Sequence, residues 1–204
     1  MTSATWGYSE YARHAYAPSD AAAWQVLVDV LGVDESRARY IIVFGGFYLM
    51  PPGDVKARRV SDPTHAMTKG QYMRIHPMPR QYPVCATTDW DASVLQENDW
   101  CMLVNKPAAV PSHPTVDNLH HNVVACLKPL RPGTQISAAH RLDVATSGLI
   151  VMCKRPSFMT AFSALHAAGA ISKRYTALLR LPHVPLGVLT HYMMRSSCAP
   201  KIYR

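Results

Sequence analysis

The spacing of apolar residues near the start of the chain predicts two short helices. Within residues 20–32 the apolar side chains recur at helical spacing, which puts them on one face of a helix: Trp24, Leu27, Val28 and Leu31. Ser19 or Asp20 can cap the beginning of this helix, and Gly32 can end it. A second helix is predicted to begin after Asp34 as its N-cap and to stop at Gly45-Gly46.

Three short segments after the second helix predict strands. They are the apolar residues 47–50, the basic residues 55–60 and residues 71–76, and the sequence Pro-Pro-Gly-Asp predicts a turn between the first two. Two short helices followed by short strands form a small α+β unit. We therefore predict a domain at residues 20–76, preceded by an N-terminal extension of residues 1–19.

Three prolines in the sequence PMPRQYP indicate a linker, which we place at residues 77–92. Residues 93–204 are predicted to form a second domain of helices and strands. Its predicted strands are residues 93–97, 101–105, 147–154, 171–180 and 188–194. Its predicted helices are residues 122–130 and a segment from a Ser157 cap to Gly169. The mixed order predicts an α+β fold with a mixed or antiparallel sheet, not a doubly wound parallel one.

Charge is distributed unevenly along the chain, whose formal net charge is +8. Residues 1–130 hold 11 Lys and Arg against 12 Asp and Glu, whereas residues 131–204 hold 10 against one, Asp143. A basic half is typical of proteins that bind an anionic partner, most often nucleic acid. From charge alone, a solvated basic surface with one structural salt bridge is an equal alternative.

The cysteines and the lengths of the apolar runs indicate an intracellular protein without a membrane span. Five scattered cysteines, none at metal-site or redox-pair spacing, indicate reduced thiols in an intracellular protein. No apolar run approaches the roughly 20 residues of a membrane span, so no membrane partner is predicted. The adjacent His120-His121 rarely converge on one ion, and no metal is predicted. Cytoplasm, nucleus and organelle (mitochondrion or plastid) all stay open as compartments.

The segment His140-Arg141-Leu142-Asp143 carries the clearest candidate chemistry. A charged, hydroxyl-rich loop runs directly into the apolar strand predicted at 147–154, which places the Asp143 carboxylate at the edge of a core. Nearby positive charge favours its ionised form. A fixed carboxylate can act as a nucleophile that forms a covalent intermediate. A His-x-x-Asp pair is also compatible with a simple hydrogen-bonded turn.

Three segments, which occur in the same order as in that family, resemble the RluA-type pseudouridine synthases. HRLDVATSGLIVMCK at 140–154 resembles the signature loop and strand of that family, LVNKPAAVPSHP at 103–114 an earlier segment, and ISKRYTAL at 171–178 a later strand. The resemblance implies an enzyme that isomerises uridine to pseudouridine in structured RNA, ribosomal or transfer. It also implies no cofactor and no metal, and we expect a monomer.

The resemblance implies a role for each matching residue. Asp143 is expected to be the nucleophile, attacking ribose C1′ or the uracil ring. Tyr175 is expected to lie against the uracil and take part in the final proton removal, and Arg141 to enter the space of the flipped nucleotide. His140 is expected to hold the loop. Further expected RNA contacts are His140, Thr146, Lys106, Lys173 and Arg174.

The first domain resembles a diverged alpha-L RNA-binding domain, which commonly precedes such catalytic domains. The matching stretches are residues 33–42, 45–48 and 67–73. The resemblance implies phosphate contacts from basic residues of this domain: Arg37, Arg39, Lys56, Arg58 and Arg59. The alternative is a small packing domain whose arginines are solvated.

The resemblance also predicts that the catalytic domain is incomplete. A later arginine-bearing segment of the family has no counterpart before Arg204, so either the chain is a fragment or another chain supplies that part. Two hypotheses follow. The first is an active pseudouridine synthase. The second is a catalytically inactive RNA-binding or ribosome-assembly factor that keeps the synthase fold.

Overall fold

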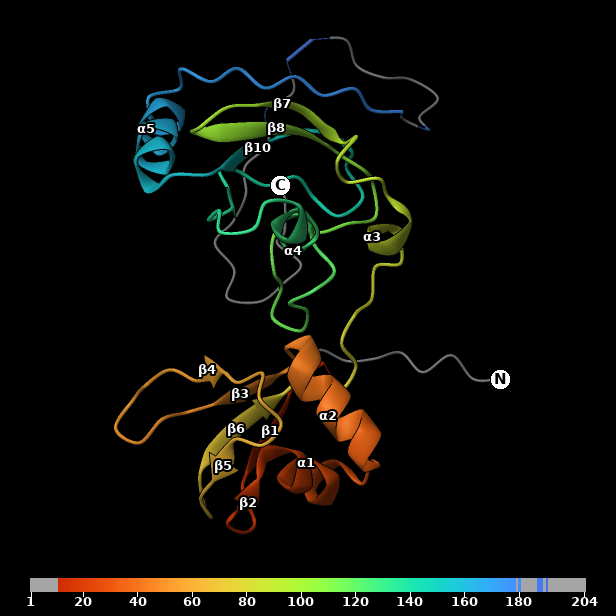
Figure 1. The fold of residues 1–204 in the computed structure, drawn as a ribbon, viewed down its shortest axis with the longest axis vertical. Coiled ribbons are helices and arrows are strands. Elements are labelled where there is room, and N and C mark those ends of the chain that lie inside the picture. Colours follow the sequence, from red (N-terminus) through yellow and green to blue (C-terminus); the bar gives the residue numbers. More distant parts are fainter. Residues whose placement is uncertain (1–10, 179, 181–186, 189, 191–204) are drawn as a thin grey trace. The chain divides into compact units, whose positions relative to one another are not determined.

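The computed structural model describes residues 11–178, 180, 187, 188 and 190, and it divides into two units, residues 1–168 and 169–204 (Figure 1). The first unit is a mixed α/β structure in which every pair of neighbouring strands is antiparallel. This agrees with the fold class predicted from the mixed order of elements. No helix in the described part of the chain is long and apolar enough to cross a membrane.

A first four-stranded sheet lies near the start of the chain. Its strands, in spatial order, are β1 (Arg13–Tyr16), β6 (Tyr72–Ile75), β3 (Phe47–Leu49) and β4 (Arg58–Arg59). The helices α1 (Ala23–Leu31) and α2 (Glu35–Phe44) pack on one face of it (Figure 1). A separate pair of short strands joins β2 (Ala21–Ala22) to β5 (Ala66–Met67).

The two predicted helices are confirmed, and their ends show why they form. The Asp34 carboxylate accepts a hydrogen bond from the backbone N–H of Arg37 at 2.7 Å, and Gly45 ends α2 with a φ of 101°. The predicted cap of α1 is wrong. Ala21 and Ala22 pair with β5, so the backbone is extended there and the helix begins at Ala23.

The strands of the first sheet follow the prediction in part. β3 and β6 lie within the predicted ranges, whereas β4 is shorter than the predicted 55–60. β1 was not predicted, because residues 1–19 show no alternation that the sequence alone makes distinctive. It forms because β6 offers a free edge, along which Arg13 to Tyr16 pair in register.

The first core fills the space between these helices and the sheet. Its fully buried members include Leu27 of α1, Ile41 of α2, and Phe47 and Ile75 of the strands. Burial of each such side chain contributes about 1.5–3 kcal/mol. The apolar side chains of α1, α2 and β6 therefore pack into one common core. This core holds the first part of the chain together.

A second four-stranded sheet lies later in the chain. Its strands, in spatial order, are β7 (Val94–Glu97), β8 (Cys101–Lys106), β10 (Gly148–Cys153) and β9 (Ser137–Ala138). The predicted strands around β7, β8 and β10 are confirmed, and the Asn98 carboxamide accepts hydrogen bonds from Trp100 and Cys101 in the predicted turn. β9 was not predicted. It is two residues long, and only its partner β10 defines it.

Short helices accompany the second sheet. They are α3 (Val84–Thr87), α4 (Val123–Leu127), the 3-10 helix η1 (Lys128–Leu130) and α5 (Pro156–Ala167). Asn122 caps α4, and its side chain accepts from the N–H of Ala125 at 3.0 Å. Ser157 is not the cap of α5, because the extended residue before the helix is Arg155.

Two predictions concern the second unit. The strand predicted at 171–180 is wrong for residues 171–178, which form no strand. A strand exists only where a second strand accepts its backbone hydrogen bonds, and no described residue pairs with this segment. Most of the strand predicted at 188–194 lies outside the described residues.

The segment 77–92, predicted to be a linker, makes specific contacts. Cys85 of α3 and Trp90 belong to the second core, and the Trp90 indole donates to the carbonyl of Cys85 at 2.8 Å. The Arg80 side chain and backbone bind the Asp117 carboxylate. The prolines thus mark a stretch without long helices or strands, but its last part is folded onto the second core.

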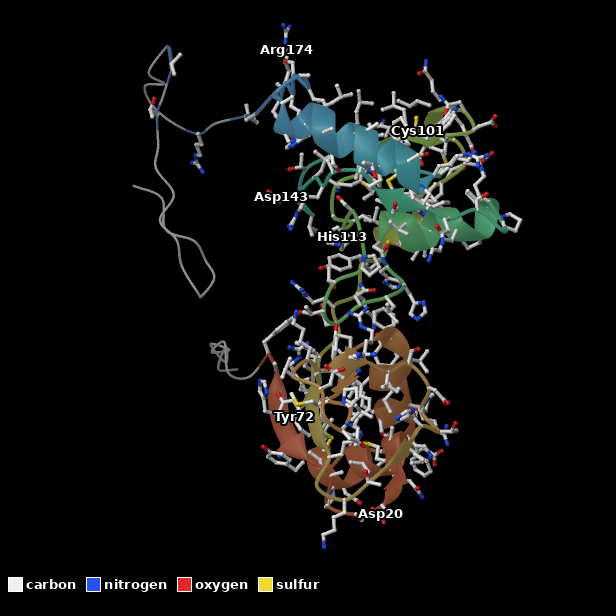
Figure 2. All side chains as sticks on the ribbon, turned by 90° about the vertical axis from the view of Figure 1, so that its left-hand side faces the viewer. Asp20, Tyr72, Cys101, His113, Asp143 and Arg174 are labelled. Carbon is white, nitrogen blue, oxygen red and sulfur yellow. The ribbon has the colours of Figure 1, made fainter. Side chains whose placement is uncertain are left out.

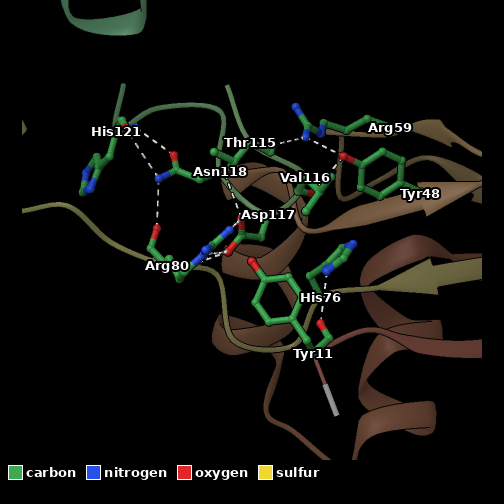
Figure 3. Close-up of polar contacts among 10 residues, drawn as sticks. All are labelled: Tyr11, Tyr48, Arg59, His76, Arg80, Thr115, Val116, Asp117, Asn118 and His121. Carbon is green, nitrogen blue, oxygen red and sulfur yellow. Dashed lines mark hydrogen bonds and ion pairs between the residues drawn. The ribbon is translucent and has the colours of Figure 1, made fainter. Parts of the chain in front are cut away.

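A polar junction, formed by residues 115–121 against Arg80 and the first sheet, joins the two halves of the first unit (Figure 3). The buried Asp117 carboxylate accepts three N–H groups of Arg80 at 3.0–3.1 Å and the Thr115 hydroxyl at 2.8 Å. From the first sheet, Tyr48 donates to the carbonyl of Val116 and Arg59 to that of Thr115.

Candidate active site

Asp143 lies on the loop between β9 and β10, beside a residue that is anchored in the core. Leu142 is buried in the second core, whereas the Asp143 side chain is 83% exposed (Figure 2). A buried leucine directly before an exposed aspartate fixes the backbone and leaves the carboxylate to solvent. The carboxylate is therefore both held and accessible, as a nucleophile toward a large substrate needs.

Ser112 holds the backbone next to Asp143. Its hydroxyl donates to the carbonyl of Leu142 at 2.8 Å and accepts the N–H of Leu142 at 3.0 Å. Ser112 is itself buried, so these bonds form away from water, where an unpaired backbone group is costly. The sequence reading did not assign Ser112 a role. Its position within the segment at 103–114, which resembles the synthase family, is the feature of the sequence that could have indicated such a role.

The buried side chain of Lys106 also supports this loop through hydrogen bonds. Its ammonium group donates to the carbonyls of Pro107 at 2.9 Å, Val110 at 2.8 Å and Val144 at 3.4 Å. Burial lowers the pKa of Lys106, and the negative charge of Asp143 opposes part of that shift. The structure differs here from the expected RNA contact, because a fully buried side chain does not reach a phosphate.

His140 and Thr146 fix the two ends of the loop. The His140 Nε2 accepts the N–H of Val151 at 3.1 Å, and its ring stacks on Phe162 of α5 at 5.8 Å. The N–H of Thr146 donates to the carbonyl of Asp143 at 3.0 Å, which closes a turn. His140 thus tethers the loop to β10 in the structure, while RNA contacts from both residues stay predictions.

Gly148 begins β10 with a φ of 120°, in the region that glycine adopts without strain. A Cβ placed on Gly148 would meet no heavy atom within 4 Å outside the neighbouring residues, so lack of space does not require glycine here. The backbone angle is what requires glycine as the loop turns into the strand.

Arg141 is the cation nearest to the nucleophile position along the chain. Its Nη2 lies 3.9 Å from the Asp143 Oδ1, and both side chains are exposed. Such an exposed pair contributes little to folding, since water screens it. Both groups are therefore accessible to a substrate, and the expected role of Arg141 beside a flipped nucleotide stays a prediction.

The other predicted residues of the later strand lie in the second unit. Tyr175, with its side chain 63% exposed, and the exposed Lys173 and Arg174 are described within that unit. The structure thus brings together Asp143, Arg141, His140, Thr146 and Lys106 on one loop and its support. The roles of the second-unit residues beside Asp143 stay predictions.

The basic residues of the first domain divide into two groups. Arg37 donates to the carbonyl of Pro77 at 2.8 Å, Arg39 pairs with Glu35 at 2.6 Å, and Arg59 binds Tyr48 and Thr115. Arg37 and Arg59 are engaged by backbone and hydroxyl groups, whereas Arg39 and Arg58 form ion pairs near the surface, Arg58 with Asp54 at 2.7 Å, and Lys56 is exposed. The phosphate contacts of these residues stay predictions.

A comparison with known protein families matches the later half of the chain. The family model described as RNA pseudouridylate synthase matches residues 101–202, a range that includes β8, the Asp143 loop, β10 and α5. The chain belongs to the RNA pseudouridylate synthase family.

Curated relatives come from plants and bacteria. The chain is 32% identical over 148 residues to the chloroplastic RNA pseudouridine synthase 6 of Oryza sativa subsp. japonica and 26% identical to that of Arabidopsis thaliana, in each case over 72% of this chain and 31% of the relative. It is 26% identical to the ribosomal large subunit pseudouridine synthase C of Vibrio cholerae, over 70% of this chain and 41% of the relative. The chain thus spans about a third of the length of the plant relatives it matches.

Proposed function

We propose that the protein isomerises uridine to pseudouridine in RNA, with Asp143 as the nucleophile. The observation that carries this proposal is the combination of an exposed carboxylate and a loop fixed by Leu142, Ser112 and Lys106. Membership of the synthase family supports the reaction type. A carboxylate that is free of strong partners but fixed in position is ready to attack without prior rearrangement.

The reaction exchanges one glycosidic bond for another. The bond between N1 of uracil and C1′ of ribose breaks, a bond between C5 and C1′ forms, the C5 proton leaves and N1 gains a proton. Attack by the Asp143 carboxylate, at C1′ or at the uracil ring, gives a covalent intermediate that allows the base to detach and turn. No electron donor or acceptor is needed, because the product is an isomer of the substrate.

The target nucleotide has to leave the base stack before Asp143 reaches it. Extrusion of a base costs a few kcal/mol, which contacts to the extruded nucleotide and its neighbours offset. We assign Arg141, which is exposed beside Asp143, to the space that the base leaves. We assign Tyr175 to the face of the uracil and to the final proton removal, on the basis of its match to the family's later strand.

We propose a structured RNA, ribosomal or transfer, as the substrate. The name of the Vibrio cholerae relative refers to the large ribosomal subunit, which supports ribosomal RNA as the first substrate to test. The region of the first sheet and α1–α2 is proposed to be an alpha-L-like RNA-binding domain. Of its predicted phosphate contacts we favour Lys56 and Arg58, because their side chains are exposed.

The test measures release of tritium from RNA that carries uridine labelled at C5, because isomerisation detaches that hydrogen. The wild-type protein is expected to release tritium from at least one ribosomal or transfer RNA transcript. Asp143→Asn is the matched control, since it keeps size and hydrogen bonding but removes the nucleophilic charge. The proposal fails if the wild-type protein binds RNA yet releases no tritium from any of these transcripts. That result would favour the second hypothesis, an inactive RNA-binding or ribosome-assembly factor.

We propose an organelle as the compartment, a plastid if the source is a plant. The support is the word chloroplastic in the names of both plant relatives. A fluorescent protein fused after the chain, expressed from the native start, tests this by microscopy. Uniform fluorescence in the cytosol or nucleus would overturn it.

A further inference from the structure

The first sheet has a second face, opposite to α1 and α2, that carries aromatic and basic side chains. The strand register aligns His14 with Arg74 and Tyr48 in one row, and Tyr16 with Tyr72 in the next. Side chains alternate between the two faces of a strand, and the residues between these five pack in the first core. The five therefore project from the outer face, and Figure 2 shows Tyr72 on the sheet with the helices on the other side.

Three of these residues form a cluster of rings, of which His14 and Tyr16 are exposed and Tyr72 is partly buried. We call His14, Tyr16 and Tyr72 the aromatic face. The rings of Tyr16 and Tyr72 lie 5.8 Å apart, and those of His14 and Tyr72 lie 5.9 Å apart. Tyr16 is 68% exposed, although a tyrosine on a sheet is more often covered. A group of exposed rings on neighbouring strands marks a surface that binds a partner.

Positive charge lies beside the aromatic face. Arg13 lies on the edge strand β1, and the Arg74 guanidinium sits 4.4 Å above the ring of Tyr48. Among residues 11–178, neither arginine has a carboxylate within ion-pairing distance. Arg37 and Arg39 of α2, in contrast, are held by partners within the protein. Arg13 and Arg74 thus differ from Arg39, whose guanidinium pairs with a carboxylate.

The outer face is continuous with the support of the Asp143 loop. Tyr48, in the same row as His14 and Arg74, donates to the carbonyl of Val116 in the junction. Shortly before the junction along the chain, Ser112 holds the backbone beside Asp143. A ligand on the aromatic face is thereby connected through packed residues to the loop that carries the nucleophile.

We propose that the aromatic face, with Arg13 and Arg74, binds a single-stranded stretch of the RNA substrate. Unpaired bases can stack on exposed rings whatever their sequence, and the two arginines match the phosphates between them. A duplex hides its base faces in its own stack, so it does not use such a surface. This inference rests on the proposed function, because it names the kind of RNA that the enzyme holds.

The test compares binding of a short, fluorescently labelled oligouridylate to the wild-type protein and to Tyr16→Ala, Tyr72→Ala and the double variant. Loss of one base–ring stack is expected to weaken binding roughly 5- to 100-fold. Tyr16→Phe keeps the ring and should bind within about twofold of the wild type, on the same stacking argument. Arg13→Gln and Arg74→Gln should each reduce the slope of log affinity against log salt by about 0.7.

Trp100 provides the matched control. It is 51% exposed in the turn between β7 and β8, with the Arg155 guanidinium 5.8 Å from its ring, so it pairs an open ring with a cation away from the first sheet. Trp100→Ala should leave the affinity unchanged. Equal loss of affinity in Trp100→Ala and Tyr16→Ala would overturn the proposal, and so would unchanged affinity in a folded double variant, with folding checked by circular dichroism.

Tritium release separates this inference from the proposed function. The double variant should need more RNA for half-maximal rate but keep its rate at saturating RNA, because Tyr16 and Tyr72 do not touch the reacting atoms. If the wild-type protein releases no tritium while Tyr16→Ala weakens oligouridylate binding, only the proposed function fails. If the wild-type protein is active and the double variant has an unchanged KM, only the aromatic face is excluded.

Discussion

Asp117 and Asp143 carry the same negative charge, but the two carboxylates lie in very different surroundings. Asp117, in the junction, has no exposed surface on its side chain and binds Arg80 and Thr115. Asp143 is 83% exposed, with Arg141 at 3.9 Å. Burial alone would raise the pKa of Asp117, but the hydrogen bonds from Arg80 hold it well below its usual range.

The difference lies in what holds each residue in place. Asp117 is held by its own carboxylate, so its charge serves the structure and is closed to any ligand. Asp143 is held by its neighbours, through the burial of Leu142 and the hydrogen bonds of Ser112 and Lys106. A carboxylate that does not have to stabilise the fold is free for chemistry. Replacing Asp143 should therefore reduce turnover and leave stability unchanged, whereas replacing Asp117 should reduce the stability of the fold.

The largest effect is expected for Asp143→Asn on turnover. The rate of tritium release should fall by roughly 10³-fold or more, on the scale seen when a covalent nucleophile is removed. The melting temperature should stay the same, because the exposed side chain takes no part in packing. Retained turnover would remove Asp143 from the mechanism, and a large drop in melting temperature would contradict the contrast with Asp117.

Asp117→Ala is expected to destabilise the fold. The free energy of unfolding should fall by about 2–4 kcal/mol, below the full range for a broken buried ion pair because the Arg80 side chain is half exposed. Urea denaturation measures this. Asp117→Asn, which keeps one acceptor oxygen, should lose less. Since the folded-state pKa is depressed, the contribution is present above the unfolded pKa of about 3.9 and is lost as pH falls below it.

Ser112→Ala tests whether the neighbours of Asp143 hold it. The unfolding free energy should fall by about 1–3 kcal/mol, because the N–H and carbonyl of Leu142 lose a buried partner. Turnover at saturating RNA should fall about 10- to 100-fold through misplacement of the nucleophile. Ser93→Ala removes a hydroxyl that donates to the carbonyl of Trp90 and serves as the control for stability without an effect on turnover.

His76 is expected to make the free energy of unfolding depend on pH in a higher range than Asp117 does. Burial lowers the pKa of His76, and the charges of Arg74 and Arg59 lower it further, while the Tyr11 carbonyl and Asp117 oppose the shift. The unfolded state, with a pKa of about 6.5, then takes up protons before the folded state does. The unfolding free energy should therefore decrease as pH falls from 7 to 5. In His76→Gln this decrease should be smaller, and an unchanged slope would exclude His76 as its source.

The smallest effect is expected where a carboxylate is exposed and not catalytic. Glu35 forms an ion pair with Arg39 one turn along α2, and both side chains are open to solvent. Glu35→Gln should change the unfolding free energy by about 0.5 kcal/mol or less and leave tritium release unchanged. A larger loss of stability would show that exposure is a poor guide to what a carboxylate does in this protein.

Local patterns identified most of the elements. The spacing of Leu27 and Leu31, the Asp34 cap and the stop at Gly45 predict helices whose formation depends on nearby residues, and these helices are present. β1 and β9 were missed because a short strand depends on its partner, and β6 and β10 lie far away along the chain. The strand predicted at 171–180 is absent over residues 171–178 for the same reason.

The sequence by itself determined the family, the position of Asp143 and the basic character of the later half, because these depend on residue identity and order. Tertiary structure decided which charged groups are available. It buried Lys106 at the base of the loop, engaged Arg37 and Arg59 within the protein, and left Arg13 and Tyr16 exposed on the sheet. Whether a cation meets a carbonyl or a phosphate depends on burial and on partners distant in the chain, and residue order alone does not specify either.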